Sequence, residues 1–267
     1  MAHLNGRVAV VTGASSGIGA AVAYQLQDAG VTVVGLARRK DAISGAVEAA
    51  RREAKERGHR PAAPAARAPG ALHCVQCDVA NEQDVVAAFK WVRDKLGAVH
   101  ILVNNAGVGG PHSLAGASNS GSDEWKRILN VNVLGLSIGT REAVKLMKEK
   151  GVDDGHIVHI GSVAGHINPL GSGEQSMYFA SKHAVRVLTE GLRKELVAAK
   201  SRIRVTEVSP GVVKTNFFDA MSIAPEVIAK QPHLLPEDVA SAVLYAVAAP
   251  SHVQIHDVII KPIGEPF

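Results

Sequence analysis

Two side chains that could move a proton together, Tyr178 and Lys182, stand four residues apart in the sequence. On a helix this spacing puts both on one face, one turn from each other. A free tyrosine titrates at about pH 10, and a neighbouring cation lowers that pKa by stabilising the phenolate. The pair therefore predicts a general acid or base that works near neutral pH. An exposed Tyr–Lys pair on a helix surface is the alternative interpretation.

Two further polar residues could serve the same reaction. Ser162 directly follows an apolar, strand-like run and can hydrogen-bond a substrate carbonyl oxygen. Asn132 stands between Val131 and Val133 in a helical stretch, where a buried amide needs hydrogen-bond partners. Asn132 could also be an amide that only satisfies packing or backbone groups.

A glycine-rich turn near the N-terminus predicts a dinucleotide site. Residues 12–19 read Thr-Gly-Ala-Ser-Ser-Gly-Ile-Gly, after the first expected strand and at the start of a helix. Glycine lets the backbone turn sharply and approach a pyrophosphate, whose charge then faces the positive end of the helix. A strand-to-helix connection without a ligand is the alternative. The expected contacts come from Gly13, Ser15, Ser16, Gly17, Ile18 and Gly19.

The end of the second expected strand favours NADP(H) over NAD(H). An NAD enzyme is expected to place Asp or Glu there for the ribose 2′-hydroxyl, but this chain has Ala37 followed by Arg38 and Arg39. A guanidinium group suits the charge and geometry of a 2′-phosphate. We expect Arg38 to be the main contact, with Arg39 or Ser15 assisting. Ordinary solvent-exposed arginines are the alternative.

The elements that must position these residues follow from hydrophobic patterning. Apolar runs of strand length alternate with longer helical patterns, as in parallel βαβ units. This predicts one α/β domain over residues 1–267, a doubly wound Rossmann fold with a seven-stranded parallel sheet. The expected strands are Arg7–Val11, Val31–Leu36, Leu72–Gln76, Ile101–Val103, Ile157–Ile160, Ile203–Val208 and Val258–Ile260. The expected helices begin near Gly17, Lys40, Glu82, Ser122, Ser176 and Pro236. A Pro- and Ala-rich surface loop is expected at 61–70.

Composition bounds the class of protein. The formal net charge of the 267 residues is +4 and the basic residues are dispersed, so we expect no binding to nucleic acid. No apolar run approaches the roughly 18 residues of a membrane span, and no signal peptide precedes the first expected strand. We therefore expect a cytoplasmic protein without an integral membrane segment.

Cys74 and Cys77 have the spacing of a redox pair or of half a zinc site. In a strand-like run, however, residues three apart point to opposite faces of the sheet. The chain has no second cysteine pair that could complete a four-ligand zinc site. We expect two buried structural cysteines and no metal.

These motifs together resemble the short-chain dehydrogenase/reductase superfamily over essentially the whole chain. The resemblance implies that Tyr178 is the general acid/base and that Lys182 tunes it and binds the ribose. It implies that Ser162 orients the carbonyl group and that Asn132 holds a proton-relay water. The motifs are residues 12–19, Asn104 to Gly107, Asn132, Ser162, Tyr178-x-x-x-Lys182 and Pro210-Gly211. The further cofactor contacts implied are Asp78, Val79, Asn104, Ala106, Gly107, Pro210, Gly211, Val213 and Thr215.

More narrowly, residues 129–142, 152–157, 189–196 and 209–213 look like the dehydrogenase/reductase SDR family member 11 group. That group includes arthropod farnesol dehydrogenases and animal NADPH-dependent reductases of steroids and diketones. The resemblance implies hydride transfer between NADP(H) and a lipophilic alcohol or its aldehyde or ketone, of the farnesol/farnesal or hydroxysteroid kind. It also implies a homodimer or homotetramer.

Substrate choice is expected to come from three loops, at 108–120, 163–177 and 212–232. The last is the candidate for a movable lid, because it contains Phe217, Phe218, Met221 and Ile223. Core or interface packing is the alternative for these apolar side chains. Two other functions are open: a regulator that binds NADP(H) without turnover, and a broad carbonyl or diketone reductase.

Overall fold

Seven parallel strands form one sheet in the order β3-β2-β1-β4-β5-β6-β7. The computed structural model describes residues 4–59, 68–110, 114, 121–167, 175–218 and 230–265. The expected seven-stranded parallel sheet is confirmed, with strand ends within one or two residues of those expected. The strands are β1 (Val8–Thr12), β2 (Thr32–Ala37), β3 (Leu72–Gln76), β4 (Ile101–Asn104), β5 (His156–Ile160), β6 (Arg204–Pro210) and β7 (Asp257–Ile260).

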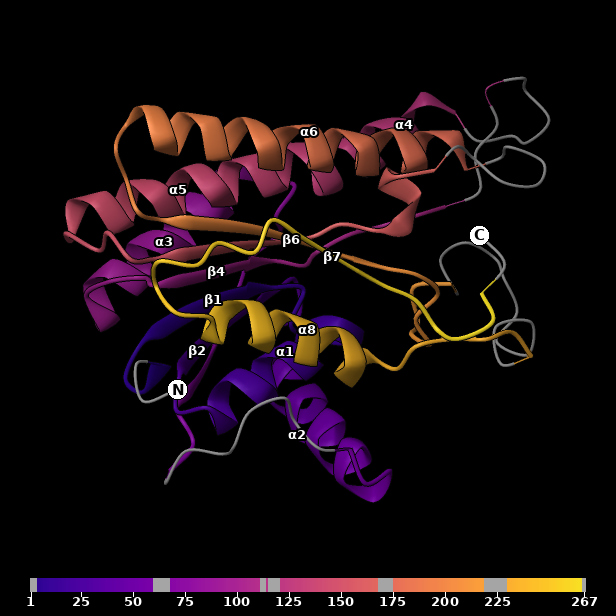
Figure 1. Ribbon diagram of the computed structural model, residues 1–267, viewed down its shortest axis with the longest axis horizontal. Helices are drawn as coiled ribbons and strands as arrows, with labels where there is room; N and C mark the ends of the chain where they lie inside the picture. The colour runs from indigo at the N-terminus through magenta and orange to yellow at the C-terminus, as the bar shows by residue number, and fades with distance from the viewer. Residues whose placement is uncertain are drawn as a thin grey trace.

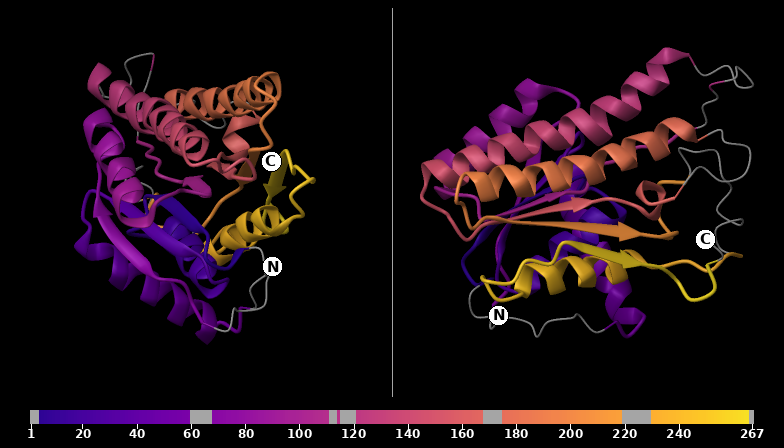
Figure 2. Two further views of the ribbon diagram at one scale, coloured as in Figure 1. Left: turned by 90° about the vertical axis from the view of Figure 1, so that its left-hand side faces the viewer. Right: turned by 45° about the horizontal axis from the view of Figure 1, so that its top comes forward.

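Helices cover both faces of the sheet, so the fold has three layers (Figures 1 and 2). In β1, Ala9 and Val11 point into one hydrophobic cluster, whereas Val8 and Val10 point into the other, as the pleat of a strand requires. The first layer holds α1 (Gly17–Asp28), α2 (Asp41–Glu56) and α8 (Pro236–Ala248). The second layer holds α3 (Glu82–Leu96), α4 (Ser122–Leu129), α5 (Leu136–Glu149) and α6 (Ser176–Ala198).

The helices begin where the sequence predicts, but one helical run contains an unexpected turn. A π-helical turn, Asn130–Gly135, joins α4 to α5. A Cβ atom at Gly135 would lie 2.6 Å from the carbonyl oxygen of Val79, so this run packs closely against the loop after β3. The turn carries Asn132, and short π-helical segments are frequent at functional sites.

The two cysteines lie on opposite faces of the sheet, as their spacing predicts. Cys74 packs against the cluster that includes α1 and α2, and Cys77 belongs to the cluster that includes α3. Cys77 is buried and burial raises its pKa to about 12, whereas Cys74 is half-buried rather than buried as expected. Within the described residues, no group of three His, Cys, Asp or Glu side chains could hold a metal ion.

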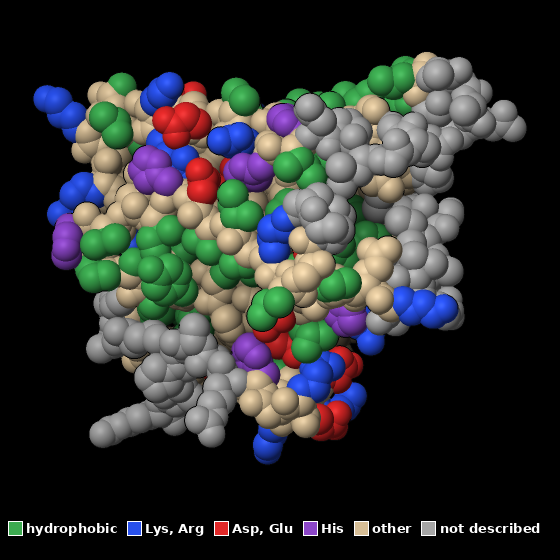
Figure 3. All heavy atoms as spheres, turned by 45° about the vertical axis from the view of Figure 1, so that its right-hand side comes forward, with side chains coloured by type: hydrophobic (Ala, Val, Ile, Leu, Met, Phe, Trp, Pro, Cys, Tyr) green, Lys and Arg blue, Asp and Glu red, His purple; other side chains and the backbone are tan. Residues whose placement is uncertain are grey.

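Charged side chains of both signs are mixed on the surface. On α2, Arg51 lies 3.1 Å from Asp28, and Arg57 after its end lies 2.8 Å from Glu237. Figure 3 shows blue and red side chains interspersed on one face. In the parts of the chain that the structure describes, no helix is long and apolar enough to cross a membrane. Residues 61–67 of the expected surface loop lie outside the described residues.

The strand order reverses next to β1, which lies between β2 and β4. At such a point the connections after neighbouring strands leave in opposite directions and open a crevice at the carboxyl ends of the strands. The fold therefore places a ligand site at the residues that follow β1, β2, β4 and β5.

Candidate active site

A cavity of about 910 Å³ opens at the carboxyl ends of the strands. Most of the residues predicted from the sequence to bind a cofactor or act in catalysis line it. They are Gly13, Ser15, Ser16, Gly17, Ile18, Arg38, Asp78, Val79, Ala106, Gly107, Ser162, Tyr178, Lys182, Pro210, Gly211, Val213 and Thr215.

Four predicted site residues, Gly19, Arg39, Asn104 and Asn132, are not among those that line the cavity. Gly19 packs behind the turn, because a Cβ atom there would lie 2.3 Å from the carbonyl oxygen of Gly13. Asn104 Nδ2 donates to Thr140 Oγ1 at 2.9 Å, so this side chain ties β4 to α5. The cavity is lined instead by the next residue, Asn105, which sequence reasoning did not separate from Asn104.

The glycine-rich turn is fixed in place by the end of β4. Gly13 has φ of +68° and Gly17 has φ of +50°, a region that favours glycine. The Oγ1 atom of Thr12 accepts hydrogen bonds from the backbone N–H groups of Asn105 and Ala106, at 2.9 and 3.0 Å. Asn105 Nδ2 in turn donates to the carbonyl oxygen of Thr12 at 2.9 Å. The turn is therefore held in shape before any ligand binds.

The start of α1 suits an anionic ligand. Ser16 is the N-cap residue, but its side chain makes no capping hydrogen bond, and the first turn of α1 contains no acidic residue. Free N–H groups and the positive end of the helix dipole therefore lie at the cavity. Arg38, which is exposed, lines the same cavity, whereas Arg39 does not. This arrangement suits the phosphate groups of a dinucleotide.

Tyr178 and Lys182 lie one helical turn apart on α6, as their spacing predicts. The Lys182 Nζ atom is 5.8 Å from the centre of the Tyr178 ring and donates to the carbonyl oxygen of Ile160 at 2.9 Å. An ammonium group has three N–H donors, so further donors remain for a ligand. Ser162 lines the same cavity as Tyr178, and its Oγ accepts from the backbone N–H of Ala164 at 3.1 Å.

The pKa values of this pair differ from the expectation that Lys182 lowers the pKa of Tyr178. Burial raises the pKa of Tyr178 to about 12, and the hydrogen bond with Ser162 opposes this rise. Burial lowers the pKa of Lys182 to about 8, against the opposing influence of the Glu207 carboxylate. In this structure burial therefore outweighs the neighbouring cation, and the phenol keeps its proton at neutral pH.

Asn132 is 2% exposed and connects the loop after β4 to α6. Its Oδ1 accepts from the backbone N–H of Val108 at 2.8 Å, and its Nδ2 donates to Ser181 Oγ at 3.0 Å. A Cβ atom at Gly107 would lie 3.6 Å from Asn132 Oδ1 and 3.9 Å from Lys182 Nζ. The three residues therefore converge beside the cavity, although the hydrogen bonds of Asn132 are those of a bridging amide.

Apolar side chains from the expected substrate loops lie beside the polar pair. The rings of Tyr178 and Phe217 are 5.5 Å apart, and Phe217 meets Phe218 edge to face at 5.7 Å. Val163 and Ile167 also line the cavity. Met221 and Ile223 lie outside the described residues.

Sequence reasoning missed Glu265, which supports the cavity from the C-terminal segment. Its side chain is 2% exposed, and its Oε2 accepts from the backbone N–H of Val212 at 3.1 Å. A Cβ atom at Gly211 would lie 2.1 Å from the same oxygen. Glu265 therefore fixes the turn after β6, and no local pattern in the sequence signals a contact across more than fifty residues.

Comparison with known proteins agrees with this geometry. Residues 7–225 match the family model described as short chain dehydrogenase. The chain belongs to the short-chain dehydrogenase family. This short-chain dehydrogenase is 45% identical over 264 residues to the farnesol dehydrogenase of Aedes aegypti, covering 98% of each chain. It is 47% identical over 261 residues to the dehydrogenase/reductase SDR family member 11 of Bos taurus, covering 96% of each chain.

Solved structures of the same kind share the Rossmann fold. The closed form of serine dehydrogenase complexed with NADP+ has a TM-score of 0.79 and 27% identity, covering 97% of this chain and 96% of that chain. A short-chain type dehydrogenase/reductase from Mycobacterium marinum has a TM-score of 0.78 and 29% identity, covering 97% and 95%. The protein is thus an oxidoreductase of a family that uses NAD(H) or NADP(H).

Proposed function

We propose that this short-chain dehydrogenase is an NADP(H)-dependent enzyme that interconverts a lipophilic alcohol and its aldehyde or ketone. The observation that carries the proposal is that Ser162, Tyr178 and Lys182 meet in one cavity that Arg38 also lines. A proton donor, a carbonyl-orienting hydroxyl and a phosphate-binding cation then face a common volume. Each is needed for carbonyl reduction by a nicotinamide with a 2′-phosphate.

NADP(H) would donate or accept the hydride when bound in this cavity. The glycine-rich turn and the start of α1 would hold the pyrophosphate, and Arg38 the 2′-phosphate. Lys182 would bind the ribose hydroxyls, and Val213 and Thr215 the carboxamide. Ala37 supports the choice of NADP(H), because its side chain lacks the carboxylate that would repel the additional phosphate.

Ser162 and Tyr178 would donate hydrogen bonds to the carbonyl oxygen, and Tyr178 would then give its proton to that oxygen. A phenol with a pKa of about 12 holds its proton at neutral pH and acts as an acid rather than as a base. In this proposal Asn132 holds the water through which Tyr178 recovers a proton.

The proposed substrate is lipophilic, of the farnesol/farnesal or hydroxysteroid kind. Phe217, Phe218 and Val163 give the cavity an apolar wall beside Tyr178. The similarity to a farnesol dehydrogenase supports the same class of substrate. A broad carbonyl or diketone reductase is the second candidate, because a cavity of about 910 Å³ can admit carbonyl compounds of several shapes.

A homodimer or homotetramer is part of the proposal. Large apolar side chains are exposed on several elements of the described chain, including Val187 and Val197 of α6, at 71% and 72%, and Tyr245 of α8, at 61%. Association of copies would bury side chains of this kind if they lie at the interface. Sedimentation of the pure protein tests this, and a monomer at working concentration would count against it. The cytoplasmic location stays a prediction from the sequence.

Absorbance of NADPH tests the activity itself. The panel contains farnesal, farnesol with NADP+, a 17-ketosteroid, a diketone and retinal, each assayed with the wild-type protein. We expect turnover with at least one lipophilic carbonyl compound and a strong preference for NADPH over NADH. Tight binding of NADPH without turnover of any compound would favour the regulator that only binds the cofactor.

A further inference from the structure

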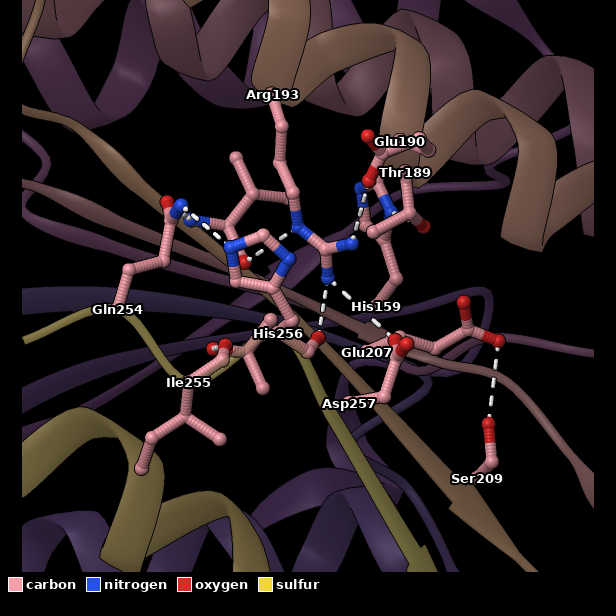
Figure 4. Close-up of polar contacts among 12 residues, drawn as sticks. His159, Thr189, Glu190, Arg193, Glu207, Ser209, Gln254, Ile255, His256 and Asp257 are labelled. Atoms are coloured by element: carbon pink, nitrogen blue, oxygen red, sulfur yellow. Dashed lines mark hydrogen bonds and ion pairs between the residues drawn. The ribbon is translucent and has the colours of Figure 1, made fainter.

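Glu207 is a buried carboxylate on β6 that the proposed reaction does not use. Its side chain is completely buried. Oε1 accepts a hydrogen bond from Ser209 Oγ at 3.1 Å, and Ser209 Oγ lies 3.1 Å from His166 Nε2 (Figure 4 draws Glu207 and Ser209). Within the described residues, Oε2 has no hydrogen-bond partner. A buried carboxylate with an open oxygen is costly unless a cation compensates its charge.

The carboxylate of Glu207 lies close to the ammonium group of Lys182. A Cβ atom at Gly161 would lie 2.1 Å from Glu207 Oε1, so only glycine leaves room for the carboxylate. The residue before it, Ile160, accepts the hydrogen bond of Lys182 Nζ at 2.9 Å. The two charged groups therefore lie beside consecutive residues at the end of β5.

Four other titratable groups surround Glu207. Burial raises the pKa of Glu207, and the hydrogen bond from Ser209 and the positive charges of Lys182 and Arg193 oppose this rise. Arg193 lies on α6, and Asp257, whose charge adds to the rise, lies on β7. Arg193 has carboxylates of its own, Glu190 at 3.0 Å and Asp257 at 3.5 Å (Figure 4). His159, paired with Glu207 in the sheet, has its pKa lowered to about 3 by burial and is neutral. His166, whose pKa burial also lowers, reaches Glu207 only through Ser209.

With the charges arranged in this way, Lys182 relies on Glu207 for a compensating negative charge. Arg193 is balanced by Glu190 and Asp257, whereas Lys182 donates to a backbone carbonyl, which carries no net charge. A buried ammonium group without a nearby negative charge loses its proton more easily. We propose that Glu207 is a positioning residue whose carboxylate is the counter-charge that keeps Lys182 in its ammonium form. The proposal rests on the proposed function, in which Lys182 binds the cofactor ribose as a cation.

The substitution Glu207→Gln tests the proposal, because glutamine has the shape of the protonated acid and lacks the charge. The two readouts are kcat/KM for carbonyl reduction and NADPH affinity by fluorescence, each followed from pH 6 to 10. In the wild type, both fall as the pH rises above about 8, because Lys182 loses its proton there. In Glu207→Gln this fall begins about one pH unit lower. Profiles that overlay those of the wild type would overturn the proposal.

Glu237→Gln is the matched control. Glu237 is also a buried glutamate, 3% exposed, but it binds Arg57 on the opposite layer of the molecule. We expect its profiles to overlay those of the wild type even if its stability is lower. A shift as large as that of Glu207→Gln would mean that loss of any buried carboxylate moves the profile, and would overturn the specific role of Glu207.

Ser209→Ala keeps the proposal testable if Glu207→Gln does not fold. Removing the hydroxyl takes a hydrogen bond from the charged form of Glu207, so the shift should have the same direction and a smaller size. A Ser209→Ala profile identical to that of the wild type would then overturn the proposal. If the wild type binds NADPH but turns over no substrate, the proposed function fails, and the binding profiles still decide the role of Glu207.

Discussion

Two groups of polar side chains lie at opposite ends of the strands, and each places a basic side chain beside other titratable groups. At the carboxyl edge, Tyr178 and Lys182 line a cavity of about 910 Å³. At the amino edge, Arg204, His156 and Asp154 surround a void of about 10 Å³, which has room for about one water molecule. Residue types alone therefore do not distinguish a reaction site from a structural cluster.

The difference lies in what the hydrogen bonds of each cluster connect. Arg204 donates to the carbonyl oxygens of Ala249 at 3.0 Å and of Val247 and Val253 at 3.3 Å, and thereby holds the end of α8 to β6. His156 bonds Thr206 at 2.8 Å. At the carboxyl edge, by contrast, the donors of Lys182, Arg38 and the start of α1 are available to a ligand. Within the described residues, Arg204 Nε and His156 Nδ1 also lack a hydrogen-bond partner. The size of the open volume beside the free donors therefore marks the site.

The largest change in turnover is expected from Tyr178→Phe. The substitution removes the proton donor but keeps the ring that packs against Phe217. Turnover should fall about 10²–10⁴-fold, because general acid catalysis of this kind is lost. NADPH affinity should stay close to that of the wild type. Steady-state kinetics and fluorescence titration of one preparation give both values, and retained turnover would remove Tyr178 from the reaction.

Arg204→Met should lower the stability of the protein and leave turnover unchanged. Methionine fills part of the space but leaves buried carbonyl oxygens without a donor, so the free energy of unfolding should fall by about 2–3 kcal/mol. The kcat should not change measurably, because Arg204 lies at the other edge of the sheet. Urea unfolding and kinetics check this. A loss of kcat with unchanged stability would place function at the amino edge.

Ala37→Asp combined with Arg38→Ala tests the proposed contact between Arg38 and the 2′-phosphate of the cofactor. Loss of the guanidinium group should weaken NADPH binding roughly 10–100-fold, the range for charged hydrogen bonds. The added carboxylate should improve the relative use of NADH. Arg39→Ala is the control, since Arg39 does not line the cavity. An unchanged ratio of NADPH to NADH use would refute the assignment to Arg38.

The smallest effect is expected from Glu265→Ala. Its carboxylate holds the backbone N–H of Val212, so its loss should loosen the turn that carries Gly211 and Val213. One hydrogen bond contributes about 1 kcal/mol, which corresponds to a roughly fivefold rise in KM for NADPH. Glu265→Gln keeps an acceptor and should behave like the wild type. Equal defects in both variants would show that the charge matters instead.

The sequence predicted the sheet and the pairing of Tyr178 with Lys182 because both depend on local spacing. Strand runs are visible as apolar stretches, and a four-residue interval fixes a helix face whatever the rest of the chain does. The glycine-rich turn was recognisable for the same reason, since it joins one strand to the next helix.

The supporting residues could not be predicted, because they depend on contacts between distant segments. Glu207 lies in β6, which also contains Arg204, Thr206 and Ser209. The strand pattern therefore indicates neither the burial of Glu207 nor its proximity to Lys182. The raised pKa of Tyr178 depends on burial by neighbouring loops, whereas the sequence shows only the nearby cation. Asn104 and Asn105 are adjacent and chemically identical, so only the direction of each side chain in the fold tells which lines the cavity.

Hydrogen–deuterium exchange with and without NADPH tests most directly whether the carboxyl edge is the site. We predict slower exchange in the first turn of α1 and in the segments after β4, β5 and β6, with no change around Arg204 and His156. Tyr178→Phe should show the same protection, since it keeps the cofactor site. Unchanged exchange at α1 at saturating NADPH, or protection confined to the amino edge, would contradict the account.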